Sequence, residues 1–347
     1  MRGVTTLAIV LALASTCPAV APALAADAPD YQNYREGRFL RYLNAQEGGR
    51  IDAVPRIGLS FGAGGEPLRA ELDSGSTGIV VAAAYIPGFE SLPSQGEGKL
   101  TYTSSGRVMV GQWVVTPVTL SGKEGASLTT APMPVLAVTE VQCLERARDC
   151  TPRQMPEHIA MVGIGFAREG DLQSQSTPDK NPLLHVAGGE GPRRQGYILS
   201  PEGVHIGLTG ENTRGDFRFL KLERNRDDTD WAPTPACLSL NGTTPPACGT
   251  LLVDTGVSVM YLTLPQAQTQ GQEGTLQPGS TLAVHVGRES DGFELYSFAA
   301  GDGSPLAPSA IHLRVADRPF VNTSFHLLNG YDVLFDAEGG YVGFRRR

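Results

Sequence analysis

Short apolar runs separated by turn residues dominate the pattern along this chain. Stretches rich in Val, Ile, Leu, Tyr and Thr recur, and glycine and proline, 42 and 25 of the 347 residues, interrupt them. Runs of this composition bounded by turn residues are typical of β-strands. The pattern therefore predicts an all-β protein, and its length is enough for one large domain or two of ordinary size.

Two of the apolar runs each contain one aspartate, followed by a small hydroxyl residue and a glycine. The first is ELDSGSTGIVV and the second is LLVDTGVSVMYL, which place Asp73 and Asp254 181 residues apart. Each is followed further along by another apolar segment with a small or polar break, IAMVGIGF and PFVNTSFHLL. This weak internal repeat predicts two related β halves that each contribute one carboxylate.

The N-terminal segment has the layout of a secretory signal. Arg2 precedes an apolar run, and small residues then lead to an A-x-A site at residues 23–25, which predicts a signal peptide over residues 1–25. The run is too short to span a membrane comfortably, and no other stretch is long and apolar enough. We therefore expect a secreted or periplasmic protein without a membrane partner after cleavage.

The charge balance excludes one class of partner. Removing residues 1–25 takes away Arg2 and no acidic residue, so the formal net charge moves from −8 to −9. Nucleic-acid binding needs clustered basic residues on the protein surface. An acidic chain with few lysines is therefore not expected to bind nucleic acid.

Four cysteines remain after removal of the predicted signal, and an even number in an exported protein favours disulfides. We expect the local pairs Cys143–Cys150 and Cys237–Cys248, each closing a small loop. The sequence contains neither closely spaced C-x-x-C pairs nor an H-E-x-x-H pattern. We therefore expect no metal site and no cofactor.

In these motifs the chain resembles the pepsin-like aspartic proteases, and the resemblance covers most of the sequence after the signal. RIGLSFGAGGEPLRAELDSGSTG resembles the family's first strands and first active-site loop, LLVDTGVS the second loop, and GYDVLFDAEGGYVGF the C-terminal strand pair. KLTYTSSGRVMVGQWVV resembles the flap hairpin. The resemblance implies two pseudo-symmetric β lobes with a cleft between them, an N-terminal lobe over 51–208 and a C-terminal lobe over 209–347.

The resemblance also implies a reaction. Two carboxylates a few ångströms apart cannot both ionise cheaply, so Asp73 and Asp254 would hold one proton between them. One carboxylate would then act as general base on a water molecule, and the protonated one would donate to the scissile carbonyl oxygen. We therefore expect a monomeric aspartic endopeptidase that acts on peptide or protein substrates.

The residues that follow each aspartate are expected to support the pair. Gly75 and Gly256 allow a tight turn and a close approach of the backbone to the carboxylates. By the resemblance, the hydroxyls of Ser74 and Thr255 cross between the lobes, and the hydroxyl of Ser76 orients the first aspartate. Such a set would hold the two acids in a fixed geometry.

Other positions extend or depart from the family pattern. Tyr102 lies in the predicted hairpin, where it would cover the substrate; an ordinary strand tyrosine is the alternative. Val257 replaces the hydroxyl residue usual after the second motif, and Ser258 is the candidate to compensate. Asn322 stands at the glycine position expected in the second apolar segment, which predicts a local distortion.

Three alternatives stay open. Either aspartate motif, taken alone, could form only a turn capped by its own carboxylate. A binding or inhibitor protein without catalysis could keep the same bilobal fold. Residues 26–50 could be an arm packed on the sheet, or a short pro-segment that presents Arg35, Arg38 and Arg41 from one helical face to the acids.

Overall fold

The computed structural model of the protein describes residues 28–62, 66–103, 105–147, 150–168, 176–189, 191–288 and 292–347. The predicted signal peptide lies outside these residues. Strands dominate them, which confirms the all-β class. In this described part, no helix has the length and apolarity needed to cross a bilayer. The helices are short 3-10 turns: η1 (Ala83–Tyr85), η2 (Phe89–Ser91), η4 (Pro178–Lys180), η5 (Pro182–Leu184), η6 (Gln266–Gln268) and η7 (Phe325–Asn329).

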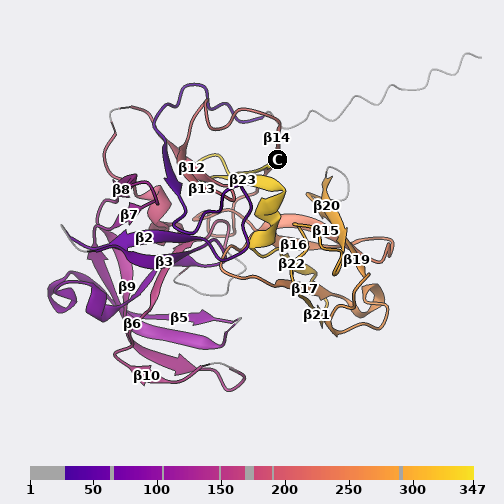
Figure 1. Ribbon diagram of the computed structural model, residues 1–347, viewed down its shortest axis with the longest axis horizontal. Helices are drawn as coiled ribbons and strands as arrows, with labels where there is room; N and C mark the ends of the chain where they lie inside the picture. The colour runs from indigo at the N-terminus through magenta and orange to yellow at the C-terminus, as the bar shows by residue number, and fades with distance from the viewer. Residues whose placement is uncertain are drawn as a thin grey trace, which may run out of the picture.

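A ten-stranded sheet is built from the first half of the chain and forms the purple group of strands in Figure 1. Its spatial order is β5-β6-β9-β4-β11-β3-β2-β7-β8, and β10 pairs with β9 outside this path. Its strands are β2 (Arg56–Ser60), β3 (Leu68–Asp73), β4 (Thr77–Ala82), β5 (Ser94–Tyr102), β6 (Arg107–Thr116), β7 (Thr119–Ser121), β8 (Ser127–Thr129), β9 (Met133–Cys143), β10 (Arg153–Gln154) and β11 (Ala160–Ile164).

An eight-stranded sheet is built from the second half and forms the orange group on the opposite side of Figure 1. Its order is β18-β21-β17-β22-β16-β15-β19-β20. Its strands are β15 (Thr234–Leu240), β16 (Ala247–Leu252), β17 (Met260–Leu264), β18 (Gly274–Thr275), β19 (Thr281–Val286), β20 (Phe293–Ala299), β21 (Ile311–Val315) and β22 (Phe320–Asn322).

The two sheets share a repeated unit of five strands. The order β9-β4-β11-β3-β2 in the first matches β21-β17-β22-β16-β15 in the second. The directions match as well: β3 runs parallel to β11 as β16 does to β22, and β4 runs antiparallel to β11 as β17 does to β22. The repeat seen in the sequence is therefore a repeat of topology, and the aspartate motifs follow β3 and β16 in corresponding places.

A six-stranded sheet joins the two halves, in the order β1-β13-β12-β23-β24-β14. In Figure 1 its strands lie between and above the other two groups. Its members come from both halves of the chain, and the predicted lobe boundary at 208/209 falls between two of them. They are β1 (Arg38–Arg41), β12 (Arg194–Leu199), β13 (Gly203–Leu208), β14 (Phe217–Lys221), β23 (Tyr331–Asp336) and β24 (Tyr341–Arg346).

The N-terminal arm is part of this sheet. Strand β1 pairs antiparallel with β13, and the buried Tyr31 hydroxyl donates to Oδ2 of Asp336 at 3.1 Å. Of the two alternatives for the arm, the helical face of arginines does not form at residues 38–41, which are extended and pair with β13, as an arm packed on the sheet would. None of residues 28–50 lines the cleft described below.

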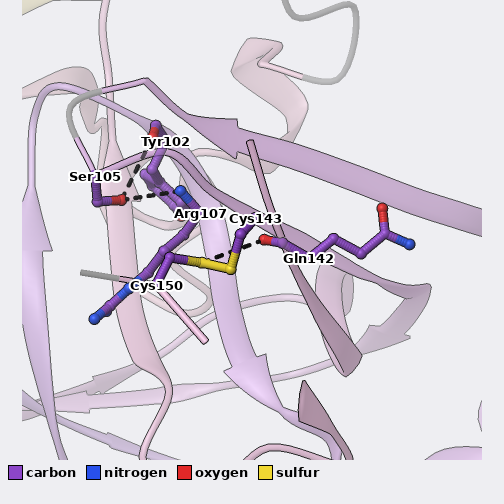
Figure 2. Close-up of a disulfide and its surroundings, with 6 residues drawn as sticks. All are labelled: Tyr102, Ser105, Arg107, Gln142, Cys143 and Cys150. Carbon is purple, nitrogen blue, oxygen red and sulfur yellow. Dashed lines mark hydrogen bonds between the residues drawn. A yellow bond between two sulfur atoms is a disulfide. The ribbon is translucent and has the colours of Figure 1, made fainter. Parts of the chain in front are cut away.

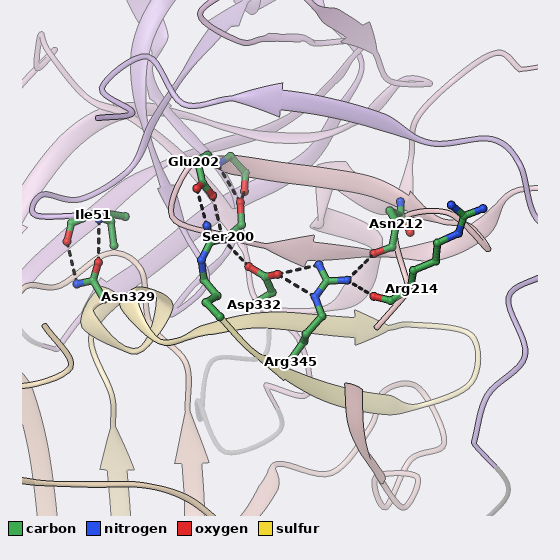
Figure 3. A network of polar contacts seen from close by, with 10 residues as sticks. Ile51, Ser200, Glu202, Asn212, Arg214, Asn329, Asp332 and Arg345 are labelled. Carbon is green, nitrogen blue, oxygen red and sulfur yellow. Dashed lines mark hydrogen bonds and ion pairs between the residues drawn. The ribbon is translucent and has the colours of Figure 1, made fainter. Parts of the chain in front are cut away.

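A polar network ties the six-stranded sheet to its surroundings (Figure 3). The buried carboxylate of Asp332 accepts from the Arg345 guanidinium at 2.7 Å and from the Arg347 guanidinium at 2.8 Å, and Arg347 also pairs with Glu202. A buried carboxylate is costly unless it is paired in this way. The network therefore fixes β23 and β24 to the turn that joins β12 and β13.

Aromatic packing connects the same sheet to the first half of the chain. Phe335 on β23 lies 5.2 Å from the ring of Phe166, which follows β11, and 5.1 Å from the ring of Tyr197 on β12. Such tilted pairs add to the burial of apolar surface that holds a core together. Phe166 and Phe335 also line the cleft, so this sheet contributes to the cleft lining through Phe335.

Both predicted disulfides are present. Cys143 at the end of β9 is bonded to Cys150, and Cys237 on β15 is bonded to Cys248, its directly opposite partner on β16. Each therefore ties together neighbouring segments that the strand pairing already brings close.

Candidate active site

The two aspartates occupy corresponding loops. Asp73 ends β3, and Asp254 follows β16 by two residues. In each loop the glycine two positions on turns its N–H back to the carboxylate: Gly75 donates to Oδ1 of Asp73 at 2.7 Å, and Gly256 donates to Oδ1 of Asp254 at 2.8 Å. The same local turn therefore presents both acids.

Reciprocal hydrogen bonds lock the two loops together. The Ser74 hydroxyl donates to the carbonyl of Val253 at 2.7 Å and accepts the N–H of Thr255 at 3.0 Å. The Thr255 hydroxyl donates to the carbonyl of Leu72 at 2.6 Å and accepts the N–H of Ser74 at 2.9 Å. Ser74 and Thr255 are buried, so water does not reach the backbone groups that they bond. Without these hydrogen bonds, those groups would be left without a partner.

The glycines lie against the opposite aspartates. A Cβ atom added to Gly75 would lie 2.3 Å from Cγ of Asp254, and one added to Gly256 would lie 2.5 Å from Oδ1 of Asp73. Real Cβ atoms do not approach other atoms this closely, so only glycine allows the two loops to close. The structure thus brings Asp73 and Asp254 together, one from each half of the chain.

Burial and proximity perturb the pair. The exposed fractions of Asp73 and Asp254 are 5% and 7%. Burial, followed by the negative charge of Asp73, raises the pKa of Asp254 from its ordinary 3.8 to about 7, while donors from Asn322 and Gly256 act in the opposite direction. The pair therefore keeps a proton at pH values where an isolated aspartate has lost it.

The donors to the outer carboxylate oxygens differ between the loops. Ser76 donates its hydroxyl to Oδ2 of Asp73 at 2.5 Å. At the corresponding position of the second loop, Val257 has no polar side chain. Ser258 does not compensate: its side chain is exposed, and in the described structure no hydrogen bond joins it to Asp254. The donor is instead Asn322, whose Nδ2 lies 2.5 Å from Oδ2 of Asp254.

Strand register corrects the position assigned to Asn322. Asn322 pairs with Leu252 and Tyr261, as Met161 pairs with Glu71 and Val80 in the first half. It is therefore the counterpart of Met161, and the counterpart of Gly163 is Ser324, two residues further on. Ser324 has a φ of 58°, a left-handed conformation that favours glycine, so the predicted local distortion lies there.

The carboxylates lie in a cleft of about 1040 Å³. Tyr102, at the end of β5, lines the same cleft and packs against a cluster that includes Trp113 and Met109 of β6. Strands β5 and β6 form the predicted hairpin, and β6 also pairs with β9 along its whole length. The hairpin is thus one edge of a larger sheet, and Tyr102 is placed near its tip.

A disulfide-closed loop braces the hairpin tip (Figure 2). The N–H of Leu144 donates to the carbonyl of Gly106 at 2.8 Å, and a Cβ atom on Gly106 would lie 2.5 Å from Cβ of Ala147. The bond between Cys143 and Cys150 closes this loop beside Tyr102 and Arg107. Sequence reasoning predicted the pairing but not this location, because it depends on how β6 and β9 pair.

Basic side chains are frequent in the cleft although the chain as a whole is acidic. Besides the aspartate pair, the carboxylate in the lining is Glu71, which is already paired with Arg56 at 2.9 Å. The arginines of the lining are Arg107, Arg146, Arg168 and Arg314. Nothing in the sequence pattern placed these residues together, because they come from four separate segments.

In the described part of the chain, no group of three His, Cys, Asp or Glu side chains is placed to hold a metal ion. A scan against protein-family models and a search of curated proteins found no match to this chain. The site is therefore interpreted from its own geometry.

Proposed function

We propose that this protein is an aspartic endopeptidase, in which Asp73 and Asp254 activate water for the hydrolysis of peptide bonds. The observation that carries the proposal is the interaction between two buried carboxylates, which come from matching loops and lie within a large cleft. A lone structural aspartate would need only local donors. When two acids lie close together, one of them stays protonated and can act as a general acid while the other acts as a general base.

The chemistry divides between the two acids. The ionised carboxylate takes a proton from water, the water oxygen attacks the scissile carbonyl carbon, and the protonated carboxyl gives its proton to the carbonyl oxygen. Collapse of the resulting gem-diol breaks the C–N bond and transfers a proton to the departing amine. Both acids are held by backbone donors and by the bonds between the loops, so little reorganisation is needed during the reaction.

Three features support the finer proposal of a bilobal, pepsin-like fold. The five-strand unit is repeated with the same order and directions, one copy in each half. A third sheet takes strands from both halves. The β5–β6 hairpin brings Tyr102 to the cleft. We propose that this hairpin is a flap over the substrate.

The substrate proposed for the cleft is an extended peptide. The cleft is at the upper end of the volume range for ligand pockets and is lined by strand residues from both halves of the chain. An extended peptide that lies between a hairpin and the strands of such a cleft is held by main-chain hydrogen bonds, with alternate side chains in pockets. Export of the protein, predicted from residues 1–25, would bring it to protein substrates outside the cytoplasm.

The test is a digestion assay with casein and haemoglobin between pH 2 and pH 7, with and without a statine-type transition-state inhibitor. We expect inhibitor-sensitive cleavage that disappears in Asp73→Asn and in Asp254→Asn. Asp317→Asn, which changes an exposed aspartate, is the matched control and should keep full activity.

The non-catalytic alternative makes the opposite prediction. A peptide-binding or inhibitor protein would cleave neither substrate at any pH, and the substitutions at Asp73 and Asp254 would change nothing that the assay measures. Cleavage that persists in both variants would also refute the proposal, because the reaction would then be using other groups.

A further inference from the structure

In the two aspartate loops, different side chains donate a hydrogen bond to the outer carboxylate oxygen, Oδ2. In the first, Ser76 lies three residues after Asp73 and donates to its outer oxygen, Oδ2, at 2.5 Å. In the second, the residue three positions after Asp254 is Val257, which has no donor. Without a substitute, Oδ2 of a buried and partly charged carboxyl would lose a hydrogen bond that its counterpart has.

Asn322 supplies this bond from a different strand. It ends β22, which runs parallel to β16, and its Nδ2 donates to Oδ2 of Asp254 at 2.5 Å. Its side-chain carbonyl, Oδ1, accepts the N–H of Ser324 at 3.0 Å. With its carbonyl bonded to the N–H of Ser324, Asn322 turns its NH₂ group to Asp254. A flipped amide would place its NH₂ against the Ser324 N–H and its oxygen against the Asp254 carboxylate, and neither pair can form a hydrogen bond. Asn322 is itself buried, with an exposed fraction of 7%.

We infer that Asn322 is the positioning residue of the second aspartate, and that it confines the proton shared by the pair. The inference rests on the proposed function. A serine hydroxyl can donate to a carboxylate or turn and accept from a carboxyl, whereas an amide NH₂ can only donate. A proton on Oδ2 of Asp254 facing Asn322 is therefore excluded, while Oδ2 of Asp73 facing Ser76 has no such restriction.

The consequence is an asymmetric pair. The proton held by Asp254 cannot point at Asn322 or at the N–H of Gly256, because both groups only donate, and the hydrogen bond between the two aspartate side chains gives it a position where it can be shared. Asp73 and the half-buried Tyr261 on β17 interact electrostatically with Asp254, and His326 hydrogen-bonds to the backbone of Ser258 in the same loop. Asn322 also lowers the pKa of Asp254, against burial and the charge of Asp73.

Removing the Asn322 side-chain amide should therefore raise the pKa of Asp254 as well as reduce activity. In Asn322→Ala, we expect kcat/KM to fall at least about tenfold, and at least one limb of the pH profile to move up by about one unit, the size expected for losing a hydrogen bond to a charged group. The double variant Asn322→Ala with Val257→Thr supplies a hydroxyl at the position equivalent to Ser76. It should return the limb towards the wild-type pH and recover most of the lost kcat/KM.

Asn181→Ala is the matched control. Asn181 is a buried asparagine of the first half, and it bonds the carbonyls of Ile164 and Gly165 without touching a carboxylate. Its loss should lower stability and leave both pH limbs in place. Should Asn322→Ala not fold, Asn322→Asp is isosteric and keeps the acceptor for Ser324; it adds a like charge, so its limb should move up further.

A second measurement separates this inference from the proposed function. The carboxyl of Asp254 is followed by NMR in protein labelled with ¹³C at aspartate Cγ, and its signal is assigned by its loss in Asp254→Asn. A higher titration midpoint in Asn322→Ala supports the inference even if the protein cleaves no substrate. An active enzyme whose Asp254 titration and pH limbs are unchanged in Asn322→Ala, or an Asn181→Ala variant with the same shift, would overturn it.

Discussion

Replacing Asp254 by asparagine should remove a pH-dependent loss of stability from the protein. The pKa of this carboxyl is raised in the folded state, first by burial and then by the charge of Asp73. Between pH 4 and 7, the unfolded chain loses the proton while the folded protein keeps it. Stability is therefore greatest below the ordinary pKa of 3.8, falls as pH rises, and levels off above about 7.

The size of the effect follows from the same shift. A change from 3.8 to about 7 is about 3 units, and at 1.36 kcal/mol per unit it corresponds to about 4 kcal/mol between the two plateaus. The slope between them cannot exceed about 1.4 kcal/mol per pH unit, because one proton is involved. Asparagine at this position adds a constant cost of about 1–3 kcal/mol, since both oxygens of Asp254 now accept N–H groups.

The assay is urea unfolding of the wild type and Asp254→Asn at pH values from 3 to 8, followed by the fluorescence of the buried Trp113 and Trp231. The informative quantity is the wild-type free energy of unfolding minus that of the variant, plotted against pH. Groups that titrate alike in both proteins cancel in this difference. Intact mass is checked after each measurement so that self-cleavage does not count as unfolding.

We expect the difference curve to fall by about 4 kcal/mol across this range. The same difference can be taken between Asp73→Asn and the double variant Asp73→Asn with Asp254→Asn. It should still fall with pH but level off at a lower pH, because Asp254 stays buried while the charge of Asp73 is gone. A curve that is flat, or that rises with pH, would refute the reasoning. It would mean that the carboxyl of Asp254 is solvated or paired with a cation in the folded protein.

Three further substitutions test how the site is built. Thr255→Val removes a hydroxyl that bonds two backbone groups of the other loop, so the free energy of unfolding in urea should fall by about 2–4 kcal/mol. Gly256→Ala places a methyl group against the carboxylate of Asp73, so kcat should fall at least about a hundredfold in a folded protein. Serine at both Cys143 and Cys150 releases the loop beside the hairpin tip, so KM should rise about threefold or more, with kcat within about twofold.

Matched changes elsewhere keep these predictions specific. Gly191→Ala meets only the side chain of Glu36, at 3.3 Å, and should leave kcat unchanged. Serine at Cys237 and Cys248 removes a disulfide outside the cleft lining and should leave KM unchanged. Equal losses in the test and control variants would show that general destabilisation is responsible, not the geometry of the site.

Local sequence patterns predicted several structural features of this protein. The two aspartate motifs, the hairpin and both disulfides each depend on residues within one loop or between adjacent strands, so their signal is contiguous. Ser74 and Thr255 are polar residues inside apolar runs, which marks them as groups that need partners after burial. Their exact partners, the carbonyls of Val253 and Leu72, required the structure.

The failures concern contacts between distant segments. Val257 signalled that a donor was missing, and the nearest hydroxyl, Ser258, was the natural candidate; the donor is Asn322, which is brought in by the pairing of β22 with β16. The arginine spacing in the arm also allowed a helix, an alternative to the arm packed on the sheet, but residues 38–41 pair with β13 as a strand. In both cases tertiary pairing overrode a local pattern, as is common for β structure.

The six-stranded sheet makes the order of synthesis matter for folding. Strand β12 pairs with β23, and β24 with β14, so the sheet stays open until residues 331–346 have left the ribosome. Until then β12 has an unpaired edge, where incomplete chains can add to one another. A chain that stops before residue 331 should therefore aggregate instead of yielding an independently folded half.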